Sequence, residues 1–122
     1  MIENIDANKK FQKELNSGTA ALVLLSLLDQ AKEPMYGYQI AKIMENADGT
    51  VSIMKLGAFY PVLRSLETGG LLASHVDPSV SGPPRRYYRI TDNGRATLGS
   101  WVNLWNRTRD FVDNILRGRT DG

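Results

Sequence analysis

Apolar side chains recur at helical spacing in three successive segments, and this pattern predicts three helices in the first half of the chain. The first predicted helix covers about Lys9–Ala31, and its apolar block at 20–28 is wide enough to be buried on more than one side. The second covers about Tyr36–Asn46 and begins its apolar face at Tyr36. The third starts at residue 56 or 57 and ends at Thr68, because Gly69-Gly70 is a typical helix stop.

The period of the pattern changes from 3.6 to 2 after these glycines. Apolar and polar residues alternate at 72–77 and again at 87–90, which predicts two short strands. The segment Pro78–Pro84 between them is rich in Ser, Gly and Pro. Two strands joined by such a segment form a hairpin with a loop longer than two residues.

The last predicted helix runs from Asp92 to about Arg117, with Thr91 as its N-cap, and would be roughly 40 Å long. A seven-residue repeat places six side chains along one seam of this helix, which is the spacing of a coiled coil. A seam of this length exceeds what the small body beside it can bury, so we expect a homodimer built on the apolar seam residues. These are Leu98, Trp101, Trp105, Val112 and Ile115.

Composition narrows the classes of function. The 122 residues suit one domain, and the absence of cysteine excludes disulfide scaffolds, thiolate metal sites and thiol nucleophiles. The single histidine, His75, excludes sites built on several imidazoles and is interpreted as structural or exposed. We therefore expect no enzyme, no cofactor and no metal. The apolar block at 20–28 is about half of the ~20 residues that a membrane helix needs, and the start of the chain is polar, so a cytoplasmic location is expected.

Three helices, a hairpin and a long helix follow one another in the order of a winged helix-turn-helix, so the expected fold class is mainly α with a small β-hairpin. Residues 1–91 would form the DNA-binding unit and 92–122 the dimerisation helix of one compact protein. The net charge is only +2, but residues 36–95 carry seven Lys or Arg against five Asp or Glu. This small basic excess favours double-stranded DNA as the partner.

The candidate DNA contacts come from the second and third helices and from the hairpin. Tyr60 either packs at a helix edge or donates its hydroxyl to a phosphate, and Arg64 lies one turn further along the same side. Arg85-Arg86 ends the hairpin loop, where adjacent arginines suit phosphates. The remaining candidates are Tyr38, Lys42 and Lys55.

Three motifs in the sequence resemble those of one known protein family. Tyr36-Gly37-Tyr38-Gln39-Ile40 and the run Phe59-Tyr60-Pro61-Val62-Leu63-Arg64-Ser65-Leu66-Glu67, followed by Gly70-Leu71-Leu72, resemble the signature of the PadR family. The third motif, Pro84-Arg85-Arg86-Tyr87-Tyr88-Arg89-Ile90-Thr91-Asp92-Asn93-Gly94, is similar to that family's wing strand and the start of its last helix. The resemblance covers about residues 15–116. One departure is Ala58, where the family commonly has a hydroxyl-bearing residue suited to a helix cap or a phosphate contact.

The resemblance implies a dimeric transcriptional regulator, in most members a repressor. The length of the chain and its single terminal helix resemble the short subgroup, which includes the lactococcal multidrug-binding repressor. Some members release DNA when a small aromatic compound binds. For this chain the resemblance implies that one or both of Trp101 and Trp105 line a cavity at the dimer interface for a planar aromatic effector, with Trp105 the closer positional match. The simpler interpretation places both in the dimer core, and the two interpretations can hold together. The alternative function is a winged-helix protein-interaction module without DNA binding.

Overall fold

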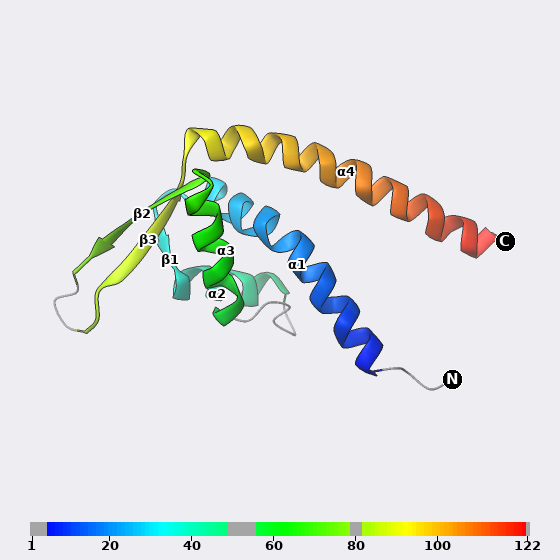
Figure 1. Cartoon of the computed structure of the whole chain (residues 1–122), viewed down its shortest axis with the longest axis horizontal. Coiled ribbons are helices and arrows are strands. Elements are labelled where there is room, and N and C mark those ends of the chain that lie inside the picture. Colours follow the sequence, from blue (N-terminus) through cyan, green and yellow to red (C-terminus); the bar gives the residue numbers. More distant parts are fainter. Residues whose placement is uncertain (1–4, 49–55, 79–81, 122) are drawn as a thin grey trace.

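The computed structural model describes residues 5–48, 56–78 and 82–121. Within these ranges four helices and three strands follow one another (Figure 1). In order they are α1 (Ile5–Gln30), β1 (Met35–Tyr36), α2 (Gly37–Asp48), α3 (Leu56–Thr68), β2 (Leu72–Asp77), β3 (Arg85–Ile90) and α4 (Asp92–Asp121). The mainly α fold class with a β-hairpin is confirmed.

The hairpin is part of a three-stranded antiparallel sheet with the order β1-β3-β2. The sequence prediction was wrong about Tyr36, which it placed in the second helix. Tyr36 lies in β1, paired with Tyr87 of β3, and α2 begins only at Gly37. The backbone N–H of Tyr36 donates to the side-chain oxygen of Gln39 at 3.1 Å, which is the return half of a capping box and explains why α2 begins there.

One hydrophobic core joins the three shorter helices, the sheet and the start of α4. Its fully buried centre comes from α1, α2 and α3: Leu24, Leu25, Ile40, Phe59 and Leu63. The sheet adds the side chains of Leu72, Tyr88 and Ile90, which all point to the face covered by helices. Because successive residues of a strand face opposite sides, the neighbours of these three residues lie on the outer face of the sheet.

Two predicted helix boundaries are confirmed by their hydrogen bonds. After α3, Gly70 has a φ of +79°, and the N–H of Leu71 donates to the carbonyl oxygen of Leu66 at 2.9 Å, which is a Schellman ending. At the start of α4, the hydroxyl of Thr91 accepts a hydrogen bond of 2.9 Å from the N–H of Gly94, as an N-cap does. The same hydroxyl donates to the carbonyl oxygen of Gly70 at 2.8 Å, so the two boundaries are tied together.

The helices α1 and α4 extend away from the rest of the molecule and diverge, like the two arms of a V (Figure 1). The 30 residues of α4 span about 45 Å. Large apolar side chains are exposed along the outer parts of both arms, among them Ile5, Phe11, Leu15, Phe111, Val112, Ile115 and Leu116. Leu98, by contrast, is only 8% exposed and belongs to the core of its own chain.

Candidate nucleic-acid interface

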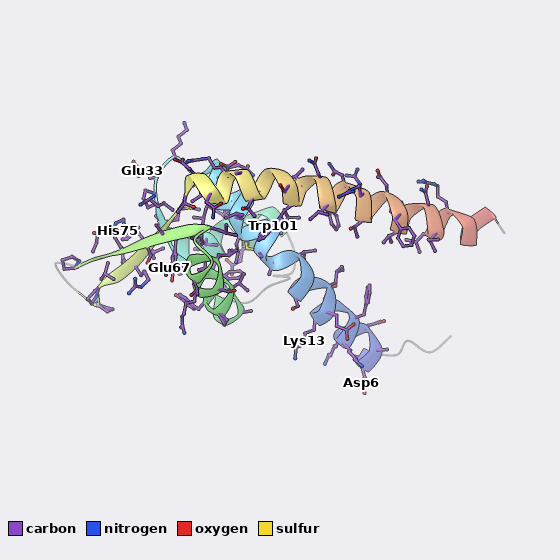
Figure 2. The ribbon with its side chains drawn as sticks, turned by 45° about the horizontal axis from the view of Figure 1, so that its top comes forward. Asp6, Lys13, Glu33, Glu67, His75 and Trp101 are labelled. Atoms are coloured by element: carbon purple, nitrogen blue, oxygen red, sulfur yellow. The ribbon has the colours of Figure 1, made fainter. Side chains whose placement is uncertain are left out.

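The inner face of the hairpin meets the end of α3 through a chain of hydrogen bonds. Arg86 and Tyr88 alternate on this face of β3, opposite Val76 and Ser74 of β2. Nη1 of Arg86 donates to the hydroxyl of Ser74 at 2.9 Å, and that hydroxyl donates to Oε2 of Glu67 at 2.5 Å. The guanidinium of Arg86 is thereby held near the last turn of α3, and Figure 2 shows Glu67 beside the hairpin.

Three of the predicted contact residues act electrostatically on one residue of this face, Tyr88. Burial raises the pKa of the Tyr88 phenol, and the nearby carboxylate of Glu67 raises that pKa further. Arg86 and Arg64 both lower the pKa of Tyr88, and Tyr60 raises it. Arg64, Arg86 and Tyr60 therefore all act on the same phenol, which is itself buried in the core. The structure therefore brings together the exposed residues that the sequence predicted on α3 and one of the two hairpin arginines.

Tyr60 packs against a neighbouring helix and is still accessible. Its ring lies against Gly37, where an added Cβ would stand 2.6 Å from the Tyr60 hydroxyl. The side chain is still 39% exposed. Its hydroxyl lies at the N-terminal end of α2, where unpaired backbone N–H groups and the helix dipole favour an anion.

Two further candidates pair with each other on α2. Nζ of Lys42 lies 5.6 Å from the centre of the Tyr38 ring, and both side chains are exposed. Tyr38 directly follows Gly37, the residue against which Tyr60 packs. Ala58 is exposed in the first turn of α3. Lys55 lies outside the described residues.

The two predicted hairpin arginines, Arg85 and Arg86, lie on different faces of the wing. Both residues lie within β3, and successive residues of a strand point to opposite faces. Arg85 is on the outer face, where its guanidinium lies 4.6 Å from the centre of the Tyr36 ring. That ring meets Tyr87 edge-on at 5.3 Å, and Tyr87 stacks on His75 at 5.5 Å. Arg85 therefore belongs to an aromatic cluster that ties β1 to the hairpin, and His75 is one of its outer members.

Sequence reasoning missed three residues that support the candidate face from behind: Glu67, Ser74 and the buried Tyr88. The signal that could have found them is the register of the hairpin. Tyr88 pairs with Ser74, and both face the same side as Arg86, two residues earlier in β3. Neither the length of the loop nor the pairing could be fixed from the sequence, because the connecting segment is not a two-residue turn.

A groove of about 450 Å³ lies between α1 and α4. Figure 2 labels Trp101 where α4 passes over α1. The lining is mostly apolar and includes Leu15, Gly18, Leu22, Trp101, Leu104 and Trp105. At Gly18 a Cβ would meet no atom within 4 Å, so this glycine leaves one wall of the groove open. The two tryptophans predicted as effector-binding residues thus share one hollow within a single chain.

The described residues were also searched for metal sites and for membrane-spanning helices. Within residues 5–48, 56–78 and 82–121, no group of three or more His, Asp or Glu side chains could hold a metal ion. In the same ranges no helix is both long enough and apolar enough to cross a membrane.

A helical core, a three-stranded wing and an exposed helix carrying Tyr60 and Arg64 define a winged helix-turn-helix protein with a long C-terminal arm. The chain belongs to the PadR-like family of transcriptional regulators, whose family model matches residues 24–100. Members of this family regulate transcription and are not enzymes, which supports the expectation of a non-enzymatic protein.

Solved structures agree with this assignment. A PadR family transcriptional regulator from Eggerthella lenta DSM 2243 is 37% identical, with a TM-score of 0.75, and the match covers 91% of this chain and 93% of that chain. A PadR-like transcriptional regulator from Bacillus cereus is 27% identical, with a TM-score of 0.67 and coverage of 84% and 96%. The fold is also similar to that of Bacillus subtilis PadR, solved in complex with operator DNA, at 24% identity and a TM-score of 0.61 over 69% of this chain and 47% of that chain.

Proposed function

We propose that this protein is a dimeric, DNA-binding transcriptional repressor. The observation that carries the proposal is the hydrogen-bonded link from Arg86 of the wing through Ser74 to Glu67 of α3. The same helix carries the exposed side chains of Tyr60 and Arg64. A helix of this size fits the major groove of DNA, and a wing beside it reaches the neighbouring phosphates. The complex of Bacillus subtilis PadR with operator DNA supports the same partner for this chain.

In this proposal each contact has a distinct role. Arg64 lies on the exposed side of α3, where a guanidinium can donate to a base edge or a phosphate. Tyr60 offers its hydroxyl beside the N-terminal end of α2, a position that suits a phosphate. Arg86 contributes the wing's cation on the same face, and Lys42 with Tyr38 extends the contact along α2. Arg85 has its role on the outer face of the wing.

The homodimer is inferred from the apolar arms. Phe111 and Ile115 of α4 are 66% and 62% exposed, and Phe11 of α1 is 65% exposed. Side chains of this kind on two diverging helices need a covering surface, and a second copy with the same two helices supplies one. Trp105, Val112 and Ile115 are the predicted seam residues that remain accessible to a partner, with Trp101 half-buried at the inner end.

The proposed division of labour places the DNA-binding unit in residues 1–91 and the dimerisation helix in 92–122. Two heads related by a two-fold axis would bind two half-sites about one turn of DNA, ~34–36 Å, or a multiple of it apart. The natural operator would therefore be an inverted repeat.

The function is tested by selecting bound duplexes from genomic fragments with the purified protein. We expect recovery of a small set of fragments that contain an inverted repeat. Their affinity should weaken moderately as the salt concentration rises, because few phosphates are neutralised. No enrichment, together with no binding to any duplex at low salt, would contradict the proposal and favour the protein-interaction module.

We also propose that a small planar aromatic compound binds in the groove between α1 and α4 and changes DNA affinity. The support is the groove itself, whose wall carries Trp101 and Trp105, because flat aromatic surfaces stack on planar ligands. We propose on this ground that the chain is a member of the short, multidrug-binding subgroup. A ligand in this groove acts on DNA binding by favouring one angle between the two arms and hence one spacing of the two heads.

Substitution of Gly18 by alanine tests the effector site. A methyl group at this position has room in the protein but narrows the groove, so we expect the Gly18→Ala variant to bind planar aromatic compounds at least about tenfold more weakly. Alanine also favours α1 by about 1 kcal/mol, so the fold should be slightly more stable. Tryptophan fluorescence titrated with a panel of such compounds measures the effect.

The matched control for the groove is Gly99→Ala, at an exposed position of α4 where an added Cβ also meets no atom within 4 Å. The aromatic compounds should quench the tryptophan fluorescence of this variant as they quench that of the unchanged protein. If no compound of a diverse panel quenches the unchanged protein while DNA binding is intact, the effector proposal is wrong.

A further inference from the structure

Glu67 is an acid at the centre of the proposed DNA-binding face. It lies in the last turn of α3, half-buried, with the cations Arg64 and Arg86 acting on the same neighbour, Tyr88. A carboxylate here repels the phosphates of DNA and by itself weakens binding. A second effect on DNA affinity is needed to compensate for this repulsion. The contact of Glu67 with the wing supplies that second effect.

Glu67 determines which group donates and which accepts in the two hydrogen bonds of the Ser74 hydroxyl. An ionised carboxylate only accepts, so the Ser74 hydroxyl gives its proton to Oε2 of Glu67 at 2.5 Å. The oxygen of Ser74 is then left to accept from Nη1 of Arg86 at 2.9 Å. This bond uses one of the five N–H donors of the guanidinium. The acid thus acts on Arg86 through a neutral hydroxyl.

We propose that Glu67 and Ser74 are positioning residues that hold Arg86 beside Arg64 in the orientation needed for a phosphate. This inference rests on the proposed DNA binding. Fixing a long, flexible side chain at the moment of binding costs affinity, so holding it in place beforehand raises affinity. The gain from this preorganisation offsets the repulsion between Glu67 and the phosphates.

A double-mutant cycle separates positioning from a merely structural role. Ser74→Ala removes the acceptor for Arg86, and we expect a roughly three- to tenfold loss of affinity for the selected duplex. In a protein that already carries Arg86→Gln, the same Ser74→Ala change should alter affinity by less than about twofold. Ser74→Thr keeps the hydroxyl and should restore nearly full affinity, while Ser100→Ala, on an exposed part of α4, should have no effect.

Substitutions of Glu67 give a second test, because removing its charge and removing its hydrogen-bond acceptor should change DNA affinity in different ways. Glu67→Gln keeps a side-chain oxygen that accepts from Ser74 but removes the negative charge, so affinity should stay unchanged or rise. Glu67→Ala removes the acceptor and should lower affinity as Ser74→Ala does. If Glu67→Gln lowers affinity as much as Glu67→Ala, the role assigned to the hydrogen bond is wrong.

The free protein provides a readout that needs no DNA. Nitrogen-15 NMR of the arginine side chains should show slowed rotation of the Arg86 guanidinium in the unchanged protein and faster rotation in Ser74→Ala. Equal rotation in both proteins, or additive losses of affinity in the cycle, would overturn the positioning role. If the unchanged protein binds no duplex at low salt, the proposed function fails, and the NMR comparison still decides whether Arg86 is held.

Discussion

Reversing the charge of both Arg64 and Arg86 is expected to lower affinity for the selected duplex at least about 100-fold. Each arginine loses a charge-assisted hydrogen bond worth about 1.5–3 kcal/mol, so the pair accounts for at least ~3 kcal/mol before the new repulsion from two glutamates is added. Both side chains are exposed and neither belongs to the core, so the fold should persist. A gel-shift titration at fixed salt measures the loss, and circular dichroism with sedimentation shows whether fold and dimer are intact.

A matched control makes the result specific to the proposed face. Lys9→Glu with Lys13→Glu changes the net charge by the same amount on α1, on the helix face opposite Phe11 and Leu15. We expect this control to lose much less affinity, because only the general attraction to DNA is reduced. Equal losses in the two variants would mean that overall charge, and not the face made by α3 and the wing, determines binding.

Placing two aspartates on the arm, Val112→Asp with Ile115→Asp, is expected to give a monomer that no longer binds the inverted repeat tightly. Both residues are exposed within one chain, so the head should fold as before. In a dimer the new carboxylates would be buried against apolar side chains at a cost of several kcal/mol. The mass in solution should then fall to that of one chain, 13.6 kDa. Affinity should drop by at least about 100-fold, because two linked heads bind far more tightly than one.

The control for the arm carries the same two added charges on its opposite face. Asn103 and Asn114 are three helical turns apart on that face, and both are exposed. Asn103→Asp with Asn114→Asp should therefore remain dimeric and bind as before. A dimer that persists in the Val112→Asp, Ile115→Asp protein by light scattering would show that the seam on α4 is not the interface.

Periodicity and caps let the sequence predict most of the fold. Thr91 before Asp92 and Gly70 after Thr68 marked helix ends correctly, because capping depends on one or two local residue types. The strand at Tyr36 was not predictable in this way. A two-residue strand has no measurable period, and it exists only because β3 lies alongside it in the folded chain.

The candidate site was predicted only in part, because local patterns can be recognised in a sequence but contacts between separate elements cannot. Tyr60 and Arg64 follow from the exposed side of a regular helix, whereas the separation of Arg85 from Arg86 follows from strand alternation and could have been read from the sequence. Glu67 and Ser74 could not, because their contact joins two elements across the α3–β2 turn. Leu98 matches the seam by spacing, but the first turns of α4 pack on the core of their own chain, so spacing alone could not place it.

Only Thr91 separates the last residue of β3 from the first residue of α4. Its hydroxyl and backbone are hydrogen-bonded to Gly70, Leu71 and Gly94, which leaves this joint little freedom to bend. The wing and α4 therefore move together as one rigid body. In the proposed dimer, a small rotation of the arms against each other would swing the wings through a much larger arc, so the angle at which the two arms cross would set the distance between half-sites.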